Sequence, residues 1–131
     1  MDYTFFMLPL SVIDGLKPVS DGQNNFIQYN GVDIYRLHVV GSVVFMETNY
    51  QEGSGYFILD DTFSTILVHF EGSVSRSVSD IKRWDLVEVL GTIDVNGEKV
   101  TLALNNIVKI DLSRYSFNKV QSIKNLKELS K

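Results

Sequence analysis

The stretch FIQYNGVDIYRLHVVGSVVF, residues 26–45, alternates apolar and polar side chains on both sides of Asn30-Gly31. Such alternation is typical of strands with one buried face, and Asn-Gly favours the positive φ angles of a type I′ turn. The stretch therefore predicts a hairpin with strands at 26–29 and 32–45. Gly41 lies inside the second strand, where glycine is unfavourable unless the strand bulges or bends. We therefore expect a tightly curled strand, shared between the two halves of a small barrel.

Further strands follow along the chain. Four runs rich in branched and aromatic residues predict strands at 56–61, 64–71, 85–94 and 98–110. A polar loop over 46–55 separates the curled strand from this set, and Asn96-Gly97 supplies a turn between the last two strands.

Two segments favour helices. The break at 72–84, between the third and fourth barrel strands, is predicted to hold a short helix capped by Ser79 or Ser77. Residues 116–130 contain neither Gly nor Pro and predict a C-terminal helix.

The order of these elements indicates the fold class. Five strands with one helix between the third and the fourth is the order of an OB-fold barrel, whereas an SH3-like barrel lacks that helix. A sandwich usually needs about seven strands. We expect an all-β chain with a five-stranded OB barrel, the short helix and a C-terminal α-helix. The OB domain spans 1–111, with 1–25 as an N-terminal extension that ends in a linker at 17–25, and the C-terminal helix for subunit association occupies 112–131.

Composition and charge exclude several functions. The chain has 131 residues, a net charge of −4, no Cys and only two His, so disulfides and thiolate zinc sites are excluded. We expect no metal and no cofactor. The apolar segment 3–13 is too short to span a bilayer, and we expect no membrane partner. Up to Asp111 the chain has seven basic and fifteen acidic residues, which argues against massed phosphate contacts with duplex nucleic acid.

Alternation also sorts the side chains of the two central strands. If one set faces the interior, the other must face outward. The expected inward set is Phe57, Leu59, Ile66, Val68 and Phe70, and the outward set is Tyr56, Ile58, Thr65, Leu67 and His69. This outward set is unusually apolar for a solvated face. A base-stacking platform and a protein interface both need such a surface.

Three segments together resemble a known family. They are NNFIQYNGVDIYRLHVVGSVV (24–44), FILDD (57–61) followed by STILVHF (64–70), and WDLVEVLGTI (84–93). They are similar to the OB domain of the second subunit of replication protein A and to the Stn subunit of the CST telomere complex, over roughly residues 24–110. The family usually has a glycine-rich turn after the paired aspartates, whereas Asp60-Asp61 here runs into Thr62-Phe63-Ser64. This departure brings Phe63 toward the expected groove mouth.

The resemblance implies a function and a setting. It implies a subunit that binds single-stranded DNA weakly on its own, beside larger and smaller OB-fold subunits of a replication protein A-like or CST-like complex. Such complexes serve DNA replication, repair or telomere maintenance. The expected location is the nucleus or the chromosome, or the nucleoid and cytoplasm of a prokaryote.

Seven residues are candidates for nucleic-acid contact. Aromatic and imidazole rings can stack on bases, and Lys and Arg can meet phosphates. The stacking candidates are Tyr50, Tyr56, Phe63 and His69, and the phosphate candidates are Arg76, Lys82 and Arg83. Each has a structural alternative. Tyr56 can pack against Trp84, His69 can be a half-exposed strand residue, and the basic residues can form an ordinary solvated surface. Trp84 itself is expected to plug a barrel end.

The paired acids Asp60 and Asp61 do not indicate catalysis. Adjacent strand residues point to opposite faces, so the two carboxylates cannot readily share a substrate atom. Hydrogen bonding to nearby backbone amides in a turn is the favoured role. The sequence also shows no Ser-His-Asp or phosphate-loop pattern, and we expect no enzyme.

The tail carries an apolar stripe at Val120, Ile123, Leu126 and Leu129. Because these residues recur every three positions, the stripe drifts by roughly 60° per step on an α-helix. The helix either packs on its own barrel or joins helices of partner subunits, as it does in the replication protein A family. We favour partner binding by these four residues.

Two other functions compete with single-stranded DNA binding. One is an OB-fold protein scaffold whose groove holds a partner peptide or the N-terminal segment of the chain, and the acidic barrel favours it. The other is an RNA-binding OB module such as an anticodon reader, which lacks an attached catalytic domain here.

Overall fold

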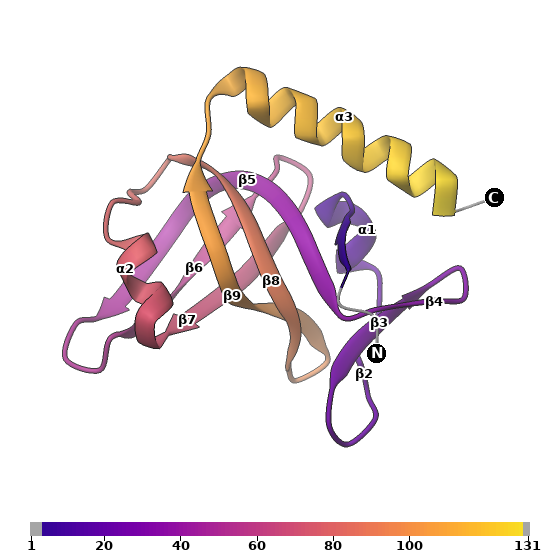
Figure 1. Cartoon of the computed structure of the whole chain (residues 1–131), viewed down its shortest axis with the longest axis horizontal. Helices are drawn as coiled ribbons and strands as arrows, with labels where there is room; N and C mark the ends of the chain where they lie inside the picture. The colour runs from indigo at the N-terminus through magenta and orange to yellow at the C-terminus, as the bar shows by residue number, and fades with distance from the viewer. Residues whose placement is uncertain (1–3, 130–131) are drawn as a thin grey trace.

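Five strands close into a barrel at the centre of the computed structural model, which describes residues 4–129 (Figure 1). They are β5 (Arg36–Asn49), β6 (Ser54–Asp60), β7 (Thr65–Glu71), β8 (Leu86–Asn96) and β9 (Lys99–Lys109). Their order is β5-β6-β7-β9-β8, and β8 pairs back onto β5 to close the barrel. β7 and β9 run parallel, and the other barrel neighbours run antiparallel. This topology confirms the expected OB barrel.

The long strand β5 serves both halves of the barrel. Residues 36–42 pair with β8, and residues 42–49 pair with β6, with a register shift between Val43 and Phe45. Gly41 lies just before this change of partner. A Cβ atom on Gly41 would lie 2.8 Å from both the Asp60 carbonyl oxygen and Leu59 Cγ. The predicted bend is confirmed, and its requirement for glycine is the close approach of β6.

The N-terminal part of the chain adds elements outside the barrel. β1 (Phe5–Met7) pairs in parallel with β5, and α1 (Leu10–Asp14) follows. β2 (Val19–Ser20), β3 (Asn25–Tyr29) and β4 (Val32–Ile34) form a separate three-stranded sheet. The predicted linker at 17–25 therefore contains a short strand.

The predicted hairpin is present, but it is not a barrel hairpin. Asn30 and Gly31 have φ angles of 49° and 78° and join β3 to β4, as expected. The predicted strand 32–45 was wrong in its boundaries, because the chain leaves β4 at Tyr35 to enter the barrel as β5. β5 also continues to Asn49, so the predicted loop 46–55 shrinks to residues 50–53.

The short helix lies where the sequence predicts it. A 3₁₀ turn at Gly72–Val74 leads into α2 (Ser75–Val78), between β7 and β8. The predicted capping was wrong, because the helix begins before Ser77 and Ser79, and no side chain caps it. Ser79 Oγ instead donates to the Arg76 carbonyl oxygen.

The interior is apolar and closed at both ends. The predicted inward set from Phe57 to Phe70 is buried, which confirms the alternation. Val78 of α2 and Ile81 extend the core on one side, and Leu10 and Ile13 of α1 extend it on another. Figure 1 shows α1 and α2 on opposite sides of the barrel. None of the helices in residues 4–129 has the length and hydropathy of a membrane span.

The C-terminal helix α3 (Leu112–Leu129) crosses over β5 and α1 (Figure 1). It begins at Leu112, as the predicted segment 112–131 does and four residues before the stretch 116–130, because Asp111 Oδ1 accepts the Arg114 backbone N–H at 2.7 Å and caps the helix. Its buried residues are Asn118 and Ser122. The helix therefore packs on the body of the chain with a mixed face, in which Leu126 and Leu129 near the C-terminal end also contact the core.

Substitution of Gly41 tests the close approach of β5 and β6. Gly41→Ala is expected to lower the free energy of unfolding by roughly 1–3 kcal/mol, since a backbone carbonyl must move to admit the methyl group. Gly15→Ala is the matched control, because Gly15 has a helical φ of −84° and its Cβ would lie 3.7 Å from the Val12 carbonyl oxygen. Urea unfolding of both variants measures the difference. Equal stability of the two would contradict the proposed constraint.

Candidate nucleic-acid interface

Five side chains form a continuous strip on the outer face of the barrel, which we call the outer strip. Cross-strand pairing sets them side by side, since Phe45 pairs with Ile58, Ile58 with Leu67, and Tyr56 with His69. The outer strip therefore consists of Phe45, Tyr56, Ile58, Leu67 and His69. The predicted outward set contained four of these residues. Phe45 was missed, because strict alternation from Val43 points it inward and the register shift after Val43 turns it outward.

Tyr56 is held in place by two neighbours. Its ring stacks on Phe45, with centroids 5.8 Å apart and an interplanar angle of 30°. A hydrogen bond with Glu47 and partial burial raise the pKa of Tyr56 above its ordinary value of 10.0. The expected alternative contact with Trp84 is replaced by Phe45. One face of the Tyr56 ring is therefore occupied before any ligand binds.

His69 is engaged at the other end of the outer strip. Its Nε2 lies 2.9 Å from Asp94 Oδ2, and Asp94 Oδ1 accepts from Asn25 Nδ2 at 3.3 Å. The His69 side chain remains 40% exposed on β7. This position matches the alternative to base stacking, in which His69 is a half-exposed strand residue. Asp94 adds negative charge beside it.

Tyr50 links the outer strip to the basic residues. It is 88% exposed in the loop between β5 and β6. It lines one shallow hollow together with Tyr56 and a second together with Lys82 and Arg83. Arg76 lines a third hollow that Tyr50 also borders. The structure therefore brings Tyr50 close to both kinds of predicted contact.

Trp84 lies outside the barrel, and its predicted role as a plug was wrong. The residue is 64% exposed and has a φ of 79°. Its backbone N–H donates to the Val43 carbonyl oxygen at 2.6 Å, and the Arg83 guanidinium carbon lies 4.7 Å from the Trp84 ring centroid. The chain turns here to enter β8, and this left-handed turn directs the indole outward. Trp84 therefore adds an exposed ring beside Arg83, which periodicity did not reveal.

Phe63 lies apart from the outer strip. It is 79% exposed in the β6–β7 turn, with Lys119 Nζ of α3 5.1 Å from its ring centroid. Lys119 also donates to the Asp61 carbonyl oxygen at 2.9 Å. The expectation that Phe63 lies at the groove mouth is not met, because this turn bends toward α3. The turn role of the acids is confirmed, since Asp61 Oδ1 accepts from the backbone N–H groups of Phe63 and Ser64.

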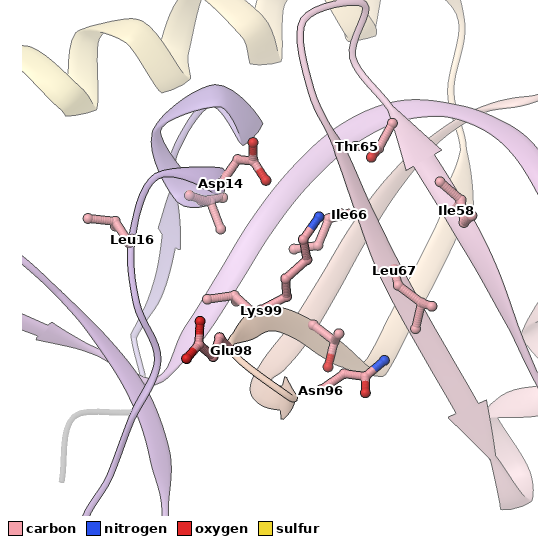
Figure 2. Close-up of a pocket in the computed structure, with 12 residues that line it drawn as sticks. Asp14, Leu16, Ile58, Thr65, Ile66, Leu67, Asn96, Glu98 and Lys99 are labelled. Carbon is pink, nitrogen blue, oxygen red and sulfur yellow. The ribbon is translucent and has the colours of Figure 1, made fainter.

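A cavity of about 260 Å³ lies between α1, β7 and the β8–β9 hairpin (Figure 2). Ile58 and Leu67 of the outer strip line it, and Ile13 and Leu16 come from the N-terminal segment. Figure 2 shows the Lys99 side chain extending toward Ile66, with Asp14 and Glu98 also at the cavity. The N-terminal segment thus forms one wall of the cavity, and part of the outer strip forms another. Two of its three charged side chains are carboxylates.

Charged side chains hold the first half of α3 on the barrel. Glu88 of β8 contacts His38 Nε2 through one carboxylate oxygen, and the other oxygen accepts from Arg114 Nε at 3.4 Å. Burial raises the pKa of Glu88, but the hydrogen bond from Arg114 and the charge of His38 outweigh it and hold that pKa below its ordinary value of 4.5. The ionised carboxylate is therefore the form that this contact stabilises.

The predicted partner-binding stripe is divided by the packing of α3. Val120 and Ile123 are 55% and 48% exposed. Leu126 and Leu129 are half-buried and pack against the core. Phe117 and Leu112 of α3 are exposed as well. The exposed apolar surface of the helix therefore consists of Leu112, Phe117, Val120 and Ile123.

Comparison with solved structures finds the same architecture in two assemblies. A chain of the S. pombe Stn1–Ten1 complex matches with a TM-score of 0.83 and 17% identity, over 96% of this chain and 93% of that one. A chain of a replication protein A heterotrimer bound to single-stranded DNA matches with a TM-score of 0.80 and 16% identity, over 96% and 98%. This chain shares their fold.

A third solved structure, of yeast Stn1 and Ten1, matches with a TM-score of 0.67 and 20% identity, over 80% of this chain and 59% of that one. No protein-family model matches the sequence, and a search of curated proteins finds no match. The match to Stn1–Ten1 and replication protein A structures supports the resemblance noted from the sequence. Within residues 4–129, no three metal-ligating side chains gather into a group.

Replacement of Glu88 tests the charged contact beneath α3. Because the folded-state pKa is lowered, ionised Glu88 stabilises the fold above pH 4.5, and this contribution is lost as the pH falls through the folded-state pKa. Glu88→Gln is expected to cost about 1 kcal/mol at pH 7 and to flatten the stability profile at acid pH. Glu98→Gln, at an exposed hairpin residue, is the control. Parallel pH profiles of Glu88→Gln and wild type, from urea unfolding at several pH values, would refute this assignment.

Proposed function

We propose that this chain is a non-enzymatic OB subunit that contacts single-stranded DNA within a replication protein A-like or CST-like complex. One observation supports the DNA contact above the others. The exposed rings of Phe45 and Tyr50 border the same hollow as Lys82 and Arg83. Rings next to cationic side chains are the combination that single-stranded nucleic acid requires.

Each group has a role in this contact. Bases stack on Tyr50 and on the free face of Tyr56, and each stacked base contributes about 1–3 kcal/mol. Lys82, Arg83 and Arg76 neutralise phosphates. Glu47 and Asp94 lie beside the outer strip and repel the backbone there. Binding by the isolated chain is therefore weak, and the phosphates contacted are few.

Assembly with other subunits would supply the remaining affinity. The full-length similarity to chains of two multi-subunit complexes supports a heteromeric setting. The apolar surface of α3 supports it independently, because Leu112, Phe117, Val120 and Ile123 are exposed to solvent. We propose that larger and smaller OB-fold subunits bind this surface, in a complex that acts on chromosomal DNA in the nucleus.

A protein scaffold is the second candidate, supported by the cavity beside α1. The N-terminal segment supplies a wall of this cavity, and Asp14 and Glu98 make its rim acidic. Phosphate is disfavoured at such a rim, whereas a peptide is not. In this alternative the groove holds protein, and the chain joins subunits without binding DNA itself.

Substitution of the two tyrosines tests the DNA contact. Tyr50→Ala is expected to weaken oligo-dT binding by about tenfold without changing the melting temperature, since the side chain is almost fully exposed. Tyr50→Phe keeps the ring and is the matched control. Tyr56→Ala should weaken binding and also lower the melting temperature, because it removes the ring that stacks on Phe45.

The same titration gives the salt dependence. With three phosphates neutralised, the slope of log K against log salt should be about −2. Fluorescence anisotropy at two salt concentrations measures the affinity and the slope. No detectable binding by wild type at low salt would favour the scaffold.

The exposed surface of α3 makes a separate prediction. Without partners, the chain is expected to self-associate through Val120 and Ile123, and Val120→Asp combined with Ile123→Asp should yield a folded monomer. Lys124→Asp, on the same outer side of α3, is the control. Size-exclusion chromatography with light scattering decides the result. A wild-type chain that stays monomeric at high concentration, or a double variant that still associates, would remove α3 as the interface.

A further inference from the structure

One edge of β5 is left without a strand. β8 pairs with β5 as far as Ser42, and the last contacts on that side are the Val43 N–H to the Asp85 carbonyl oxygen and the Trp84 N–H to the Val43 carbonyl oxygen. Beyond them, residues 44–49 have β6 on one side and, within residues 4–129, no strand on the other. Open strand edges are templates for pairing with another chain.

An apolar hollow adjoins this edge. It has a volume of about 290 Å³ and lies between β5 and α2. Met46 and Thr48 of β5 line it, together with three buried core residues, Phe70, Val78 and Ile81. Because side chains alternate along a strand, Met46 and Thr48 point away from the face that carries Phe45 and Glu47. The hollow is therefore on a different face from the outer strip.

The charged residues that line the two hollows at this edge are of one sign. The hollow beside α2 has Arg76 as its charged lining residue, and the neighbouring hollow, which shares Met46, Thr48 and Tyr50 with it, has Lys82 and Arg83. No carboxylate lines either hollow. Three of the seven basic residues up to Asp111 thus gather at one edge of an acidic chain. The cavity beside α1, by contrast, is lined by Asp14 and Glu98.

The nearby acids do not cancel this charge. Asp85 accepts the Lys82 backbone N–H at 2.8 Å and lies 3.6 Å from Lys109 Nζ, so it is already engaged. Asp80 and Glu52 are exposed in adjoining loops and line neither hollow. Glu47 belongs to the edge, but it lies on the face of the outer strip, where it hydrogen-bonds Tyr56. The face of the edge toward the hollow beside α2 therefore has a net positive environment.

We propose that an extended acidic segment of a partner protein binds here as an added strand on β5. Main-chain hydrogen bonds to residues 44–49 would align about five or six residues of the segment. Its alternate side chains would enter the hollow beside α2 as apolar anchors, and acidic side chains would meet Arg76, Lys82 and Arg83. This inference goes beyond the proposed DNA contact, since it assigns a second ligand to the open edge of β5 and the hollow beside α2. The two ligands share Arg76, Lys82 and Arg83 and would compete for them.

A peptide fits this edge better than a nucleic acid does. Single-stranded DNA carries no main-chain N–H and C=O groups to continue a β-ladder. The floor of the hollow consists of the buried side chains Phe70, Val78 and Ile81, and the one exposed ring at the hollow, Tyr50, lies at its rim in the β5–β6 loop. Arg83 Nε donates to the Val44 carbonyl oxygen at 3.1 Å, and an added strand would have to replace this bond at the first position of the edge.

A labelled peptide tests the site on the full chain. The probe is a fluorescein-labelled peptide of about seven residues with alternating Leu and Glu, and its counterpart has Lys in place of Glu. We expect the acidic peptide to bind at least about tenfold more tightly than the basic one, and Arg76→Glu to weaken it about tenfold. Lys99→Glu, a matched charge reversal at the cavity beside α1, should leave its affinity unchanged.

Hydrogen exchange distinguishes an added strand from a purely electrostatic contact. Binding of the acidic peptide should protect backbone amides within residues 44–49, and Ser75→Trp, which fills the hollow, should abolish both binding and protection. Equal affinity for the two peptides, no binding of the acidic peptide, or no protection of these amides would each overturn the proposal.

The Tyr56→Ala variant separates this site from the DNA contact, because Tyr56 belongs to the outer strip and lines neither hollow at the edge. Tyr56→Ala should weaken oligo-dT and leave the acidic peptide unaffected, so failure of one proposal does not imply failure of the other. If oligo-dT instead protects residues 44–49 and Tyr56→Ala weakens both probes equally, the edge belongs to the nucleic-acid site and the peptide proposal falls.

Discussion

The approach of Gly41 to the carbonyl group of Asp60 governs the rest of the barrel. At this point β5 leaves β8 and joins β6, and a side chain larger than hydrogen would hold the two strands apart. Three features follow from it. The register shift after Val43 turns Phe45 to the outside, the pairing with β8 stops at Ser42, and the far half of β5 keeps an open edge. The aromatic surface and the open edge thus have one origin.

Alternation and turn chemistry were enough to predict the barrel. Period-two patterns at residues 56–61 and 64–71 placed Phe57 and Val68 inside, because a one-residue slip would expose every core side chain of these strands. Local chemistry also predicted the turn at Asn30-Gly31. The strand boundaries near Tyr35 and Asn49 could not be predicted from the sequence pattern, because tertiary pairing and not composition decides where β4 ends and how far β5 continues.

The candidate site was predicted less well, for identifiable reasons. Tyr50 was predicted as a stacking candidate because its position in a loop and its residue type are enough to indicate an exposed aromatic ring. Phe45 and Trp84 were missed, because a bulge and a left-handed residue invert the direction that periodicity assigns. Phe63 was placed wrongly, because the turn after Asp61 is drawn to Lys119, a residue 58 positions away. A contact between residues so far apart in the chain leaves no signal in the local sequence.

The two partners of β5 lie at very different distances from it along the chain. β5 and β6 are joined by residues 50–53 alone, whereas Leu37 of β5 pairs with Gly91 of β8 across more than half of the barrel sequence. Closing such a long loop costs chain entropy before any contact repays it. The β5–β6 hairpin is thus free to form early, and the β5–β8 seam is the contact that completes folding. A newly made chain exposes its apolar interior until β9, which lies between β7 and β8 in the barrel, has been synthesised, so the barrel cannot close on the ribosome before all five strands have emerged.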